Sequence, residues 1–197
     1  MVIGYGQRST RHVRRRQASA FFKAAKFAEE HGPPLNLLVT LNLSHTACPA
    51  EYADMATRII CQKFGRWLRH QSKKALQSGG SGYGPPRYQR VIEAPDDIHH
   101  VHWLVSVPPS LQALFEKVLP KWLLKVAGSI HQPAGLIDIK PIDSVMAASR
   151  YCMKGVEPNH ARRCFVRPQP QGVVVGQRVA ISRSLSRAAR RAAGWRA

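Results

Sequence analysis

The spacing of hydrophobic residues changes along the chain and predicts an order of strands and helices. Residues 19–30 carry apolar side chains at helical spacing, and the segment His-Gly-Pro-Pro ends that helix. Residues 36–44 alternate, with the odd-numbered apolar residues from Leu37 to Leu43 on one side, which predicts a strand with one buried face. Residues 49–74 return to helical spacing, and Pro49 suits a first helical turn.

The pattern continues through a hairpin and a second helix. A loop rich in Gly and Pro is predicted over 77–86, and two strands over 87–94 and 98–107 flank a turn at 95–97. The remaining predicted elements are a helix over 110–127 that is interrupted or restarted near Pro120, a strand over 136–140 and a helix over 142–154 that Gly155 closes.

The order from 36 to 140 is β-α-β-β-α-β, which predicts an α+β, ferredoxin-like (split βαβ) fold. In that fold an antiparallel sheet carries helices on one face, and its other face is free for an active site. Three parts follow from this assignment. Residues 1–34 are a basic N-terminal extension with one helix, 35–156 the folded domain, and 157–197 a basic, weakly structured C-terminal extension with a short strand at 173–175 and a final arginine-rich helix.

The charge of the chain points to a polyanionic partner. There are 30 Lys and Arg against 11 Asp and Glu, a formal net charge of +19. Folding does not need this excess, whose usual effect is attraction to a polyanion. Nucleic acid is the first candidate partner, because each neutralised phosphate releases counterions. A membrane surface and an inert solvated face are the alternatives. Phosphate contacts are expected from two terminal clusters, at Arg14, Arg15 and Arg16 and at Arg190 and Arg191.

The cysteine pattern and the hydropathy of the chain indicate its cellular compartment. The four cysteines include no Cys-x-x-Cys pair, so neither a zinc site nor a disulfide framework is predicted. The basic N-terminus has no apolar segment behind it, unlike a secretory signal, and no apolar run approaches the roughly 20 residues that span a bilayer. We therefore expect a soluble, cytoplasmic protein with reduced thiols and no membrane partner.

The strand over 98–107 carries the candidate metal ligands. His100 and His102 point to the same side, and the apolar residues that alternate with them point to the other. Two imidazoles one pleat apart can bind one divalent ion. Thr40 and Asn42 of the first strand share that open face and are expected to contact the nucleic acid. The alternative is a hydrated strand whose two histidines bind nothing.

A carboxylate is needed to complete such a site. Glu93, on the adjacent strand of the hairpin, is the natural candidate, while Asp96 and Asp97 compete from the turn. His99 points to the core side by alternation and is left out. Carboxylate oxygens suit hard cations and imidazoles admit Mn²⁺, so the expected cofactor is a divalent metal, Mg²⁺ or Mn²⁺.

A tyrosine and a lysine stand near the end of the last predicted helix of the folded domain. Tyr151 and Lys154 are at i and i+3 and share a helix face. A phenol, whose pKa is ordinarily near 10, becomes a nucleophile when a neighbouring ammonium and a metal-polarised phosphate stabilise its anion. The alternative is an amphipathic helix end with a lysine that matches the helix dipole.

These motifs together resemble the HUH endonuclease superfamily, specifically the rolling-circle replication initiators. The strand at Leu38–Asn42, the pair His100-Val-His102 and the helix at Tyr151–Lys154 occur in the family order, and the resemblance covers roughly residues 36–155. It implies a metal held by Glu93, His100 and His102 that polarises a scissile phosphate in single-stranded DNA.

The resemblance also implies the reaction. Tyr151 attacks in line and leaves a 5′-phosphotyrosine and a free 3′-OH, with Lys154 orienting the phosphate or the tyrosine. The DNA would be an origin or a hairpin, and the free 3′-OH could prime synthesis by a host polymerase. No P-loop is present, so a helicase would also come from the host.

This chain departs from the family pattern in having one tyrosine. Ala147 stands four residues before Tyr151, so termination requires a second protomer, as in a homodimer, or an activated water. Relaxases place the tyrosine before the histidines, which counts against that branch. A transposase or mobilisation nuclease with the same chemistry, and a non-catalytic module that binds single strands or RNA, remain alternatives.

Overall fold

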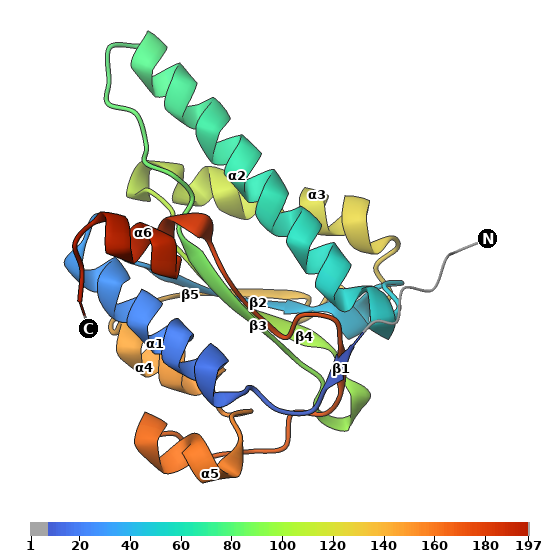
Figure 1. The fold of residues 1–197 in the computed structure, drawn as a ribbon. Helices are drawn as coiled ribbons and strands as arrows, with labels where there is room; N and C mark the ends of the chain where they lie inside the picture. The colour runs from blue at the N-terminus through green and yellow to red at the C-terminus, as the bar shows by residue number, and fades with distance from the viewer. Residues whose placement is uncertain (1–7, 197) are drawn as a thin grey trace.

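The computed structural model describes residues 8–196, so residues 1–7 of the predicted N-terminal extension and Ala197 lie outside it. The predicted β-α-β-β-α-β order is present and the α+β fold class is confirmed (Figure 1). Its elements are β2 (Leu37–Asn42), α2 (Ala53–Gln77), β3 (Tyr88–Glu93), β4 (His100–Val105), α3 (Gln112–Ala127) and β5 (Ile137–Pro141).

The main sheet is antiparallel throughout and has the strand order β5-β2-β4-β3-β7. Its edge strand β7 (Val179–Ile181) pairs with β3. A second, two-stranded sheet joins β1 (Ser9–Thr10) to β6 (Val174–Val175), which brings segments from opposite ends of the chain together. The C-terminal segment expected to be weakly structured therefore contributes a strand to the main sheet.

One face of the sheet is covered by α2 and α3, as the alternation in the strands predicts. Val39 and Trp103 project from β2 and β4, and they are packed with Phe64 of α2 and Phe115 of α3. The Phe64 and Trp103 rings meet edge to face at 5.4 Å. Aromatic side chains of this size supply a large share of the free energy that holds such layers together.

The opposite face is also covered, which corrects the expectation of helices on one face alone. There α1 (Arg15–Glu30) and α4 (Val145–Cys152) pack on the sheet, and α6 (Arg187–Ala192) lies beside α1 (Figure 1). Phe21 of α1, Val91 of β3 and Leu104 of β4 are buried in this second core. The physical reason is that β3 and β4 carry apolar side chains on both faces, so both faces must be removed from water.

Short helical turns complete the chain. They are α5 (Pro158–Ala161) and the 3-10 helices η1 (Leu43–His45), η2 (Ala50–Tyr52), η3 (Pro95–Asp97), η4 (Pro109–Leu111), η5 (Arg162–Cys164) and η6 (Arg183–Leu185). The strand predicted over 36–44 consequently ends at Asn42. Within residues 8–196, none of the helices combines the length and hydropathy needed to cross a bilayer.

Candidate active site

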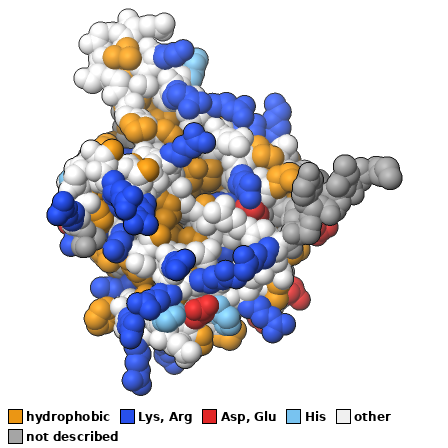
Figure 2. All heavy atoms as spheres, viewed as in Figure 1, with side chains coloured by type: hydrophobic (Ala, Val, Ile, Leu, Met, Phe, Trp, Pro, Cys, Tyr) orange, Lys and Arg blue, Asp and Glu red, His pale blue; other side chains and the backbone are white. Residues whose placement is uncertain are grey.

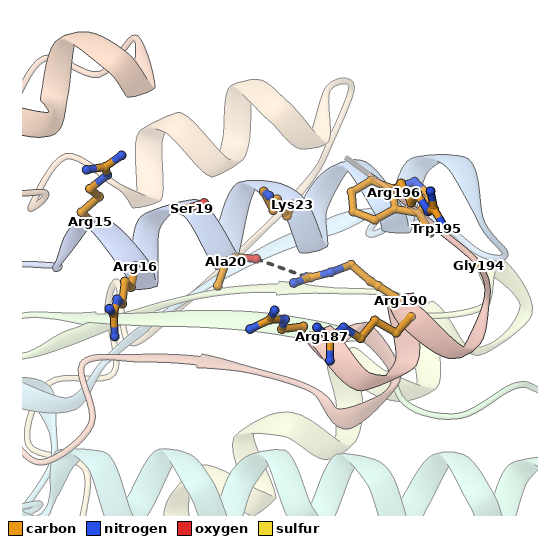
Figure 3. Close-up of a pocket in the computed structure, with 11 residues that line it drawn as sticks. Arg15, Arg16, Ser19, Ala20, Lys23, Arg187, Arg190, Gly194, Trp195 and Arg196 are labelled. Carbon is orange, nitrogen blue, oxygen red and sulfur yellow. Dashed lines mark hydrogen bonds between the residues drawn. The ribbon is translucent and has the colours of Figure 1, made fainter.

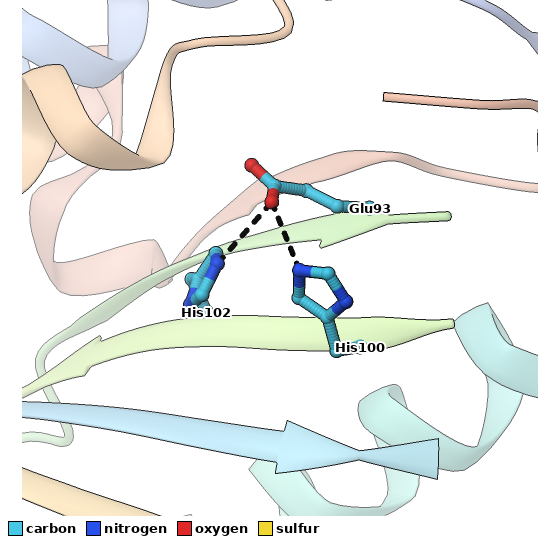
Figure 4. A group of neighbouring side chains, drawn as sticks. All are labelled: Glu93, His100 and His102. Atoms are coloured by element: carbon cyan, nitrogen blue, oxygen red, sulfur yellow. Dashed lines mark hydrogen bonds and ion pairs between the residues drawn. The ribbon is translucent and has the colours of Figure 1, made fainter. Parts of the chain in front are cut away.

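Strand register brings the predicted metal ligands together on the face that α1 and α4 cover. Glu93 of β3 lies opposite His100 of β4, and His102 lies opposite Thr40 of β2. His100 Nε2 is 3.0 Å from Glu93 Oε2, and His102 Nε2 is 3.2 Å from the same oxygen (Figure 4). One potential ligand atom from each of the three residues lies within 4.8 Å of the others.

The protons available to His100 are too few for its two contacts. Its Nδ1 lies 3.2 Å from the Ile98 carbonyl oxygen, and its Nε2 faces the Glu93 carboxylate. A neutral imidazole carries one N–H, so only one of these nitrogens can donate. The other nitrogen presents its lone pair to an oxygen, and a cation bound at Nε2 would remove that conflict.

Two further atoms of the cluster are buried without a hydrogen-bond partner among the described residues. They are Glu93 Oε1 and His102 Nε2, and the latter is close to Glu93 Oε2 without hydrogen-bond geometry. Leaving a buried polar atom unsatisfied is costly, and a bound cation would satisfy both atoms. The residues present therefore fit a divalent metal.

The electrostatics of the cluster favour the protonation states of Glu93 and His102 that can bind a metal. Burial by itself would raise the pKa of Glu93, but the contacts with His100 and His102 and the charge of Lys154 outweigh it and lower the pKa to about 2. Burial lowers the pKa of His102 against the attraction of Glu93. Glu93 is thus an anion at neutral pH, and His102 favours the neutral form that offers a lone pair.

The predicted nucleophile lies directly over this cluster. The ring centroids of Tyr151 and His102 are 4.9 Å apart, in an edge-to-face arrangement. Tyr151 is 49% exposed, whereas His102 is buried, so the Tyr151 side chain packs on the cluster and is also accessible from solvent. Ser144 caps the N-terminus of α4 by accepting a hydrogen bond from the Ala147 N–H, which fixes the start of the helix that carries Tyr151.

Lys154 connects the nucleophile to the ligands. It lies in the turn just beyond α4, which ends at Cys152, two residues before the end of the predicted helix. Its Nζ is 2.9 Å from Glu93 Oε2 and 4.4 Å from the centroid of the Tyr151 ring. Burial would lower the pKa of Lys154, but Glu93 and then Tyr151 raise it, so the ammonium stays charged.

No family model and no curated protein matches this chain. Its functional assignment therefore rests on the geometry of the site.

The other predicted residues of the two strands and the turn have distinct places. Thr40 Oγ1 lies 3.2 Å from His102 Nδ1, so it orients that ring. Asn42 donates a side-chain hydrogen bond to the Gly135 carbonyl, which ties β2 to the loop before β5. The competing acids Asp96 and Asp97 are exposed in η3, outside the cluster, and the excluded His99 is buried, with Nδ1 3.0 Å from the Asp97 carbonyl.

The predicted phosphate-binding arginines divide into exposed and buried ones. Arg14, Arg15 and Arg16 are exposed at the start of α1, and Arg191 is exposed on α6. Arg190 is 6% exposed and donates to the Leu185 carbonyl at 3.0 Å. Its burial argues against the predicted phosphate contact. Its hydrogen bond to the Leu185 carbonyl instead stabilises the position of α6.

Arg178 is a residue of the site's surroundings that the sequence prediction missed. It is buried and donates to the carbonyls of Thr10 at 2.8 Å and Gly172 at 2.6 Å. Burial lowers its pKa to about 10, against the attraction of Glu93. It braces the end of β3, where its Nη1 lies 3.4 Å from the Ile92 carbonyl. Its position among apolar residues of the sequence was the one signal that could have indicated its burial.

Proposed function

We propose that this protein is a metal-dependent endonuclease that nicks and rejoins single-stranded DNA through Tyr151, as in the rolling-circle initiators that its motifs resemble. The observation that carries the proposal is the position of the Tyr151 ring, 4.9 Å from the ring of His102. A protein that only binds DNA has no use for a half-exposed phenol beside two imidazoles and a buried carboxylate.

Glu93, His100 and His102 would hold the cation, which is Mg²⁺ or Mn²⁺ in this proposal. Bound there, it supplies Lewis-acid stabilisation of the charge that develops on the scissile phosphate. Thr40 supports this ligand set, because a hydrogen bond to the second ring nitrogen of a histidine ligand fixes its tautomer and orientation.

Tyr151 performs the covalent step. Its phenol gives its proton to water, and the phenolic oxygen attacks phosphorus to form a phosphotyrosine bond. The bond from phosphorus to the 3′ oxygen breaks, and that oxygen takes a proton from water and leaves as a free 3′-OH. The bond to tyrosine conserves the phosphodiester, so attack by a 3′-OH reverses the step and rejoins the strand. The Lys154 ammonium, 4.4 Å from the centroid of the Tyr151 ring, would offset the negative charge that develops on the attacked phosphate.

The test is a covalent adduct mapped to its residue. The chain is mixed with a random-sequence single-stranded DNA library labelled at the 3′ end, with Mn²⁺, and resolved on a denaturing gel. A labelled protein band that EDTA and Tyr151→Phe abolish is the expected result. Tyr52→Phe is the matched control, because Tyr52 is an exposed tyrosine outside the site and its loss leaves the band unchanged. An adduct that persists in Tyr151→Phe, or DNA binding without any adduct, refutes the proposal.

His102→Ala separates chemistry from binding. We expect it to lose cleavage and keep most of the DNA affinity, because exposed arginines and lysines supply the affinity. Fluorescence anisotropy with a labelled single strand measures the second quantity. A parallel collapse of binding would contradict this division of labour.

A further inference from the structure

An open basic groove lies between α1 and α6, outside the proposed active site (Figure 3). Its volume is about 1140 Å³. The two helices come from opposite ends of the chain, and Arg190 joins them by donating to the Ala20 carbonyl at 3.4 Å. The exposed cations that line the groove are Arg15, Arg16, Lys23, Arg187, Arg191 and Arg196.

These cations have no anionic partner within residues 8–196. No carboxylate lines the groove, and none of the six forms an ion pair. Figure 2 shows Lys and Arg side chains gathered over this view of the molecule, with few acidic ones among them. Holding like charges along two packed helices opposes folding, and a polyanion in the groove would relieve that repulsion.

The one aromatic side chain of the groove is already engaged. Trp195 donates its Nε1–H to Glu30, its ring meets Phe27 edge to face at 5.6 Å, and Arg190 lies 5.9 Å from its centroid. Single-strand sites combine charge with free aromatic faces on which unpaired bases stack. This groove offers charge without a free face, which suits the phosphate backbone of a nucleic acid whose bases are paired.

The basic surface continues from the groove toward the tyrosine helix. A second hollow of about 430 Å³, on the α4 side of α1, shares Arg15, Ser19 and Lys23 with the groove. It extends to Arg150 of α4, the residue before Tyr151. A DNA molecule in the groove would therefore have a path of positive charge to the helix that bears the nucleophile.

We propose that the α1–α6 groove binds duplex DNA that adjoins the single-stranded target, through sequence-independent phosphate contacts. The inference rests on the proposed function for its DNA partner, but it does not require cleavage. It assigns exposed arginines of α1 and α6 to one duplex site, separate from the site that positions the scissile strand.

The test measures duplex binding in full-length chains that all carry Tyr151→Phe, so that nicking cannot interfere. Arg187→Ala/Arg191→Ala removes two groove cations, and Arg66→Ala/Arg69→Ala removes two exposed arginines from α2, across the sheet. The probes are a duplex of about 20 base pairs and a dT single strand of the same length. Anisotropy gives Kd at several salt concentrations.

We expect the groove variant to bind the duplex more weakly and to lower the slope of log K against log salt by about 2, since each lost phosphate contact removes about 1. The ratio of its duplex Kd to that of the chain with Tyr151→Phe alone should shrink about tenfold between about 50 and 200 mM salt. Lys23→Ala should lower the slope by about 1. The α2 variant should change neither quantity, and dT binding should change less than duplex binding in every groove variant.

Equal losses in the groove and α2 variants would overturn the inference, because they would show a response to net charge alone. Equal losses for duplex and dT would overturn it as well, because the groove would not select paired DNA. The adduct assay is run separately on the chain with Tyr151 restored. A missing adduct in the otherwise unaltered chain would refute the nuclease proposal and leave the duplex result standing.

Discussion

Glu93→Gln tests whether one buried carboxylate balances the positive charge of the Lys154 ammonium and thereby stabilises the fold. Glu93 is fully buried, and its Oε2 lies within 3.2 Å of Lys154 Nζ, His100 Nε2 and His102 Nε2. Glutamine keeps the shape of the side chain and removes its charge. The variant therefore leaves the Lys154 ammonium beside a neutral amide, and it should destabilise the metal-free protein.

The pKa of Glu93 sets the size of the effect. Its fall from an ordinary 4.5 to about 2 corresponds to about 3 kcal/mol at about 1.36 kcal/mol per pH unit. Because the folded-state pKa is depressed, this stabilisation is fully present above pH 4.5 and is lost as the pH falls toward 2. Glutamine mimics the protonated side chain, so Glu93→Gln should cost about 3 kcal/mol at pH 7, and the difference from the unaltered chain should shrink below pH 4.5.

Urea unfolding in EDTA at pH 7 and at pH 3 measures this difference, with equal m values required for the comparison. Asp138→Asn is the matched control, because Asp138 also pairs with a lysine, Lys140 at 2.8 Å, but the pair is about half exposed. Exposed pairs contribute about 0–1 kcal/mol. A Glu93→Gln cost no larger than that of Asp138→Asn at pH 7 would refute the electrostatic account. Added Mn²⁺ should raise the melting temperature of the unaltered chain more than that of Glu93→Gln.

Two further substitutions test a contact of the ligand His102 and a close backbone approach beside Ala94. Thr40→Val removes the oxygen 3.2 Å from His102 Nδ1 and should weaken Mn²⁺ binding by about 10- to 100-fold, measured by calorimetry; an unchanged Kd would show that Thr40 does not orient the ring. Gly172→Ala should cost at least about 3 kcal/mol in urea unfolding, because φ is +57° and a Cβ would lie 1.7 Å from the Ala94 carbonyl oxygen. Gly79→Ala, at φ +77° with nothing within 4 Å of its Cβ, should cost about 1 kcal/mol, and equal costs would contradict the close approach.

The candidate metal ligands and the order of elements from β2 to β5 along the chain could be predicted because each depends on a short local pattern. The two-residue period of β4 places His100 and His102 on one side, and the hairpin turn sets Glu93 opposite His100. Once the turn fixes that register, the three side chains must converge. The 4.9 Å approach of the Tyr151 ring to the His102 ring depends on how α4 packs, which the strand pattern does not contain.

The covered second face was missed because the same strand pattern is ambiguous. Leu104 lies on the His102 side of β4, two residues further on, and Val91 lies opposite His102 on β3. Both are fully buried beneath α1 and α4. Apolar side chains flanking a polar pair indicate a site at the edge of a covered face, and the prediction gave weight only to the polar residues of that face, the two histidines with Thr40 and Asn42.

The pairing of β7 could not be predicted, since it is three residues long and joins residues about ninety positions apart in the chain. A strand that short has no measurable period. Its place depends on long-range contacts, such as the hydrogen bond from the Ile92 N–H to the Arg178 carbonyl at 2.8 Å. Arg178 is buried by the same docking, so its exposure could not be assigned before the fold was known.

The composition of the ligand set argues for catalysis over structural metal binding. Glu93 is the one carboxylate among the three ligands, so a divalent cation there would keep a net charge of about +1. Lys154 adds a second positive charge 2.9 Å from Glu93 Oε2. Each further carboxylate ligand would cancel part of this positive charge. This site keeps an excess of positive charge beside a half-exposed phenol, and an incoming phosphodiester is the anion that this excess would attract and polarise.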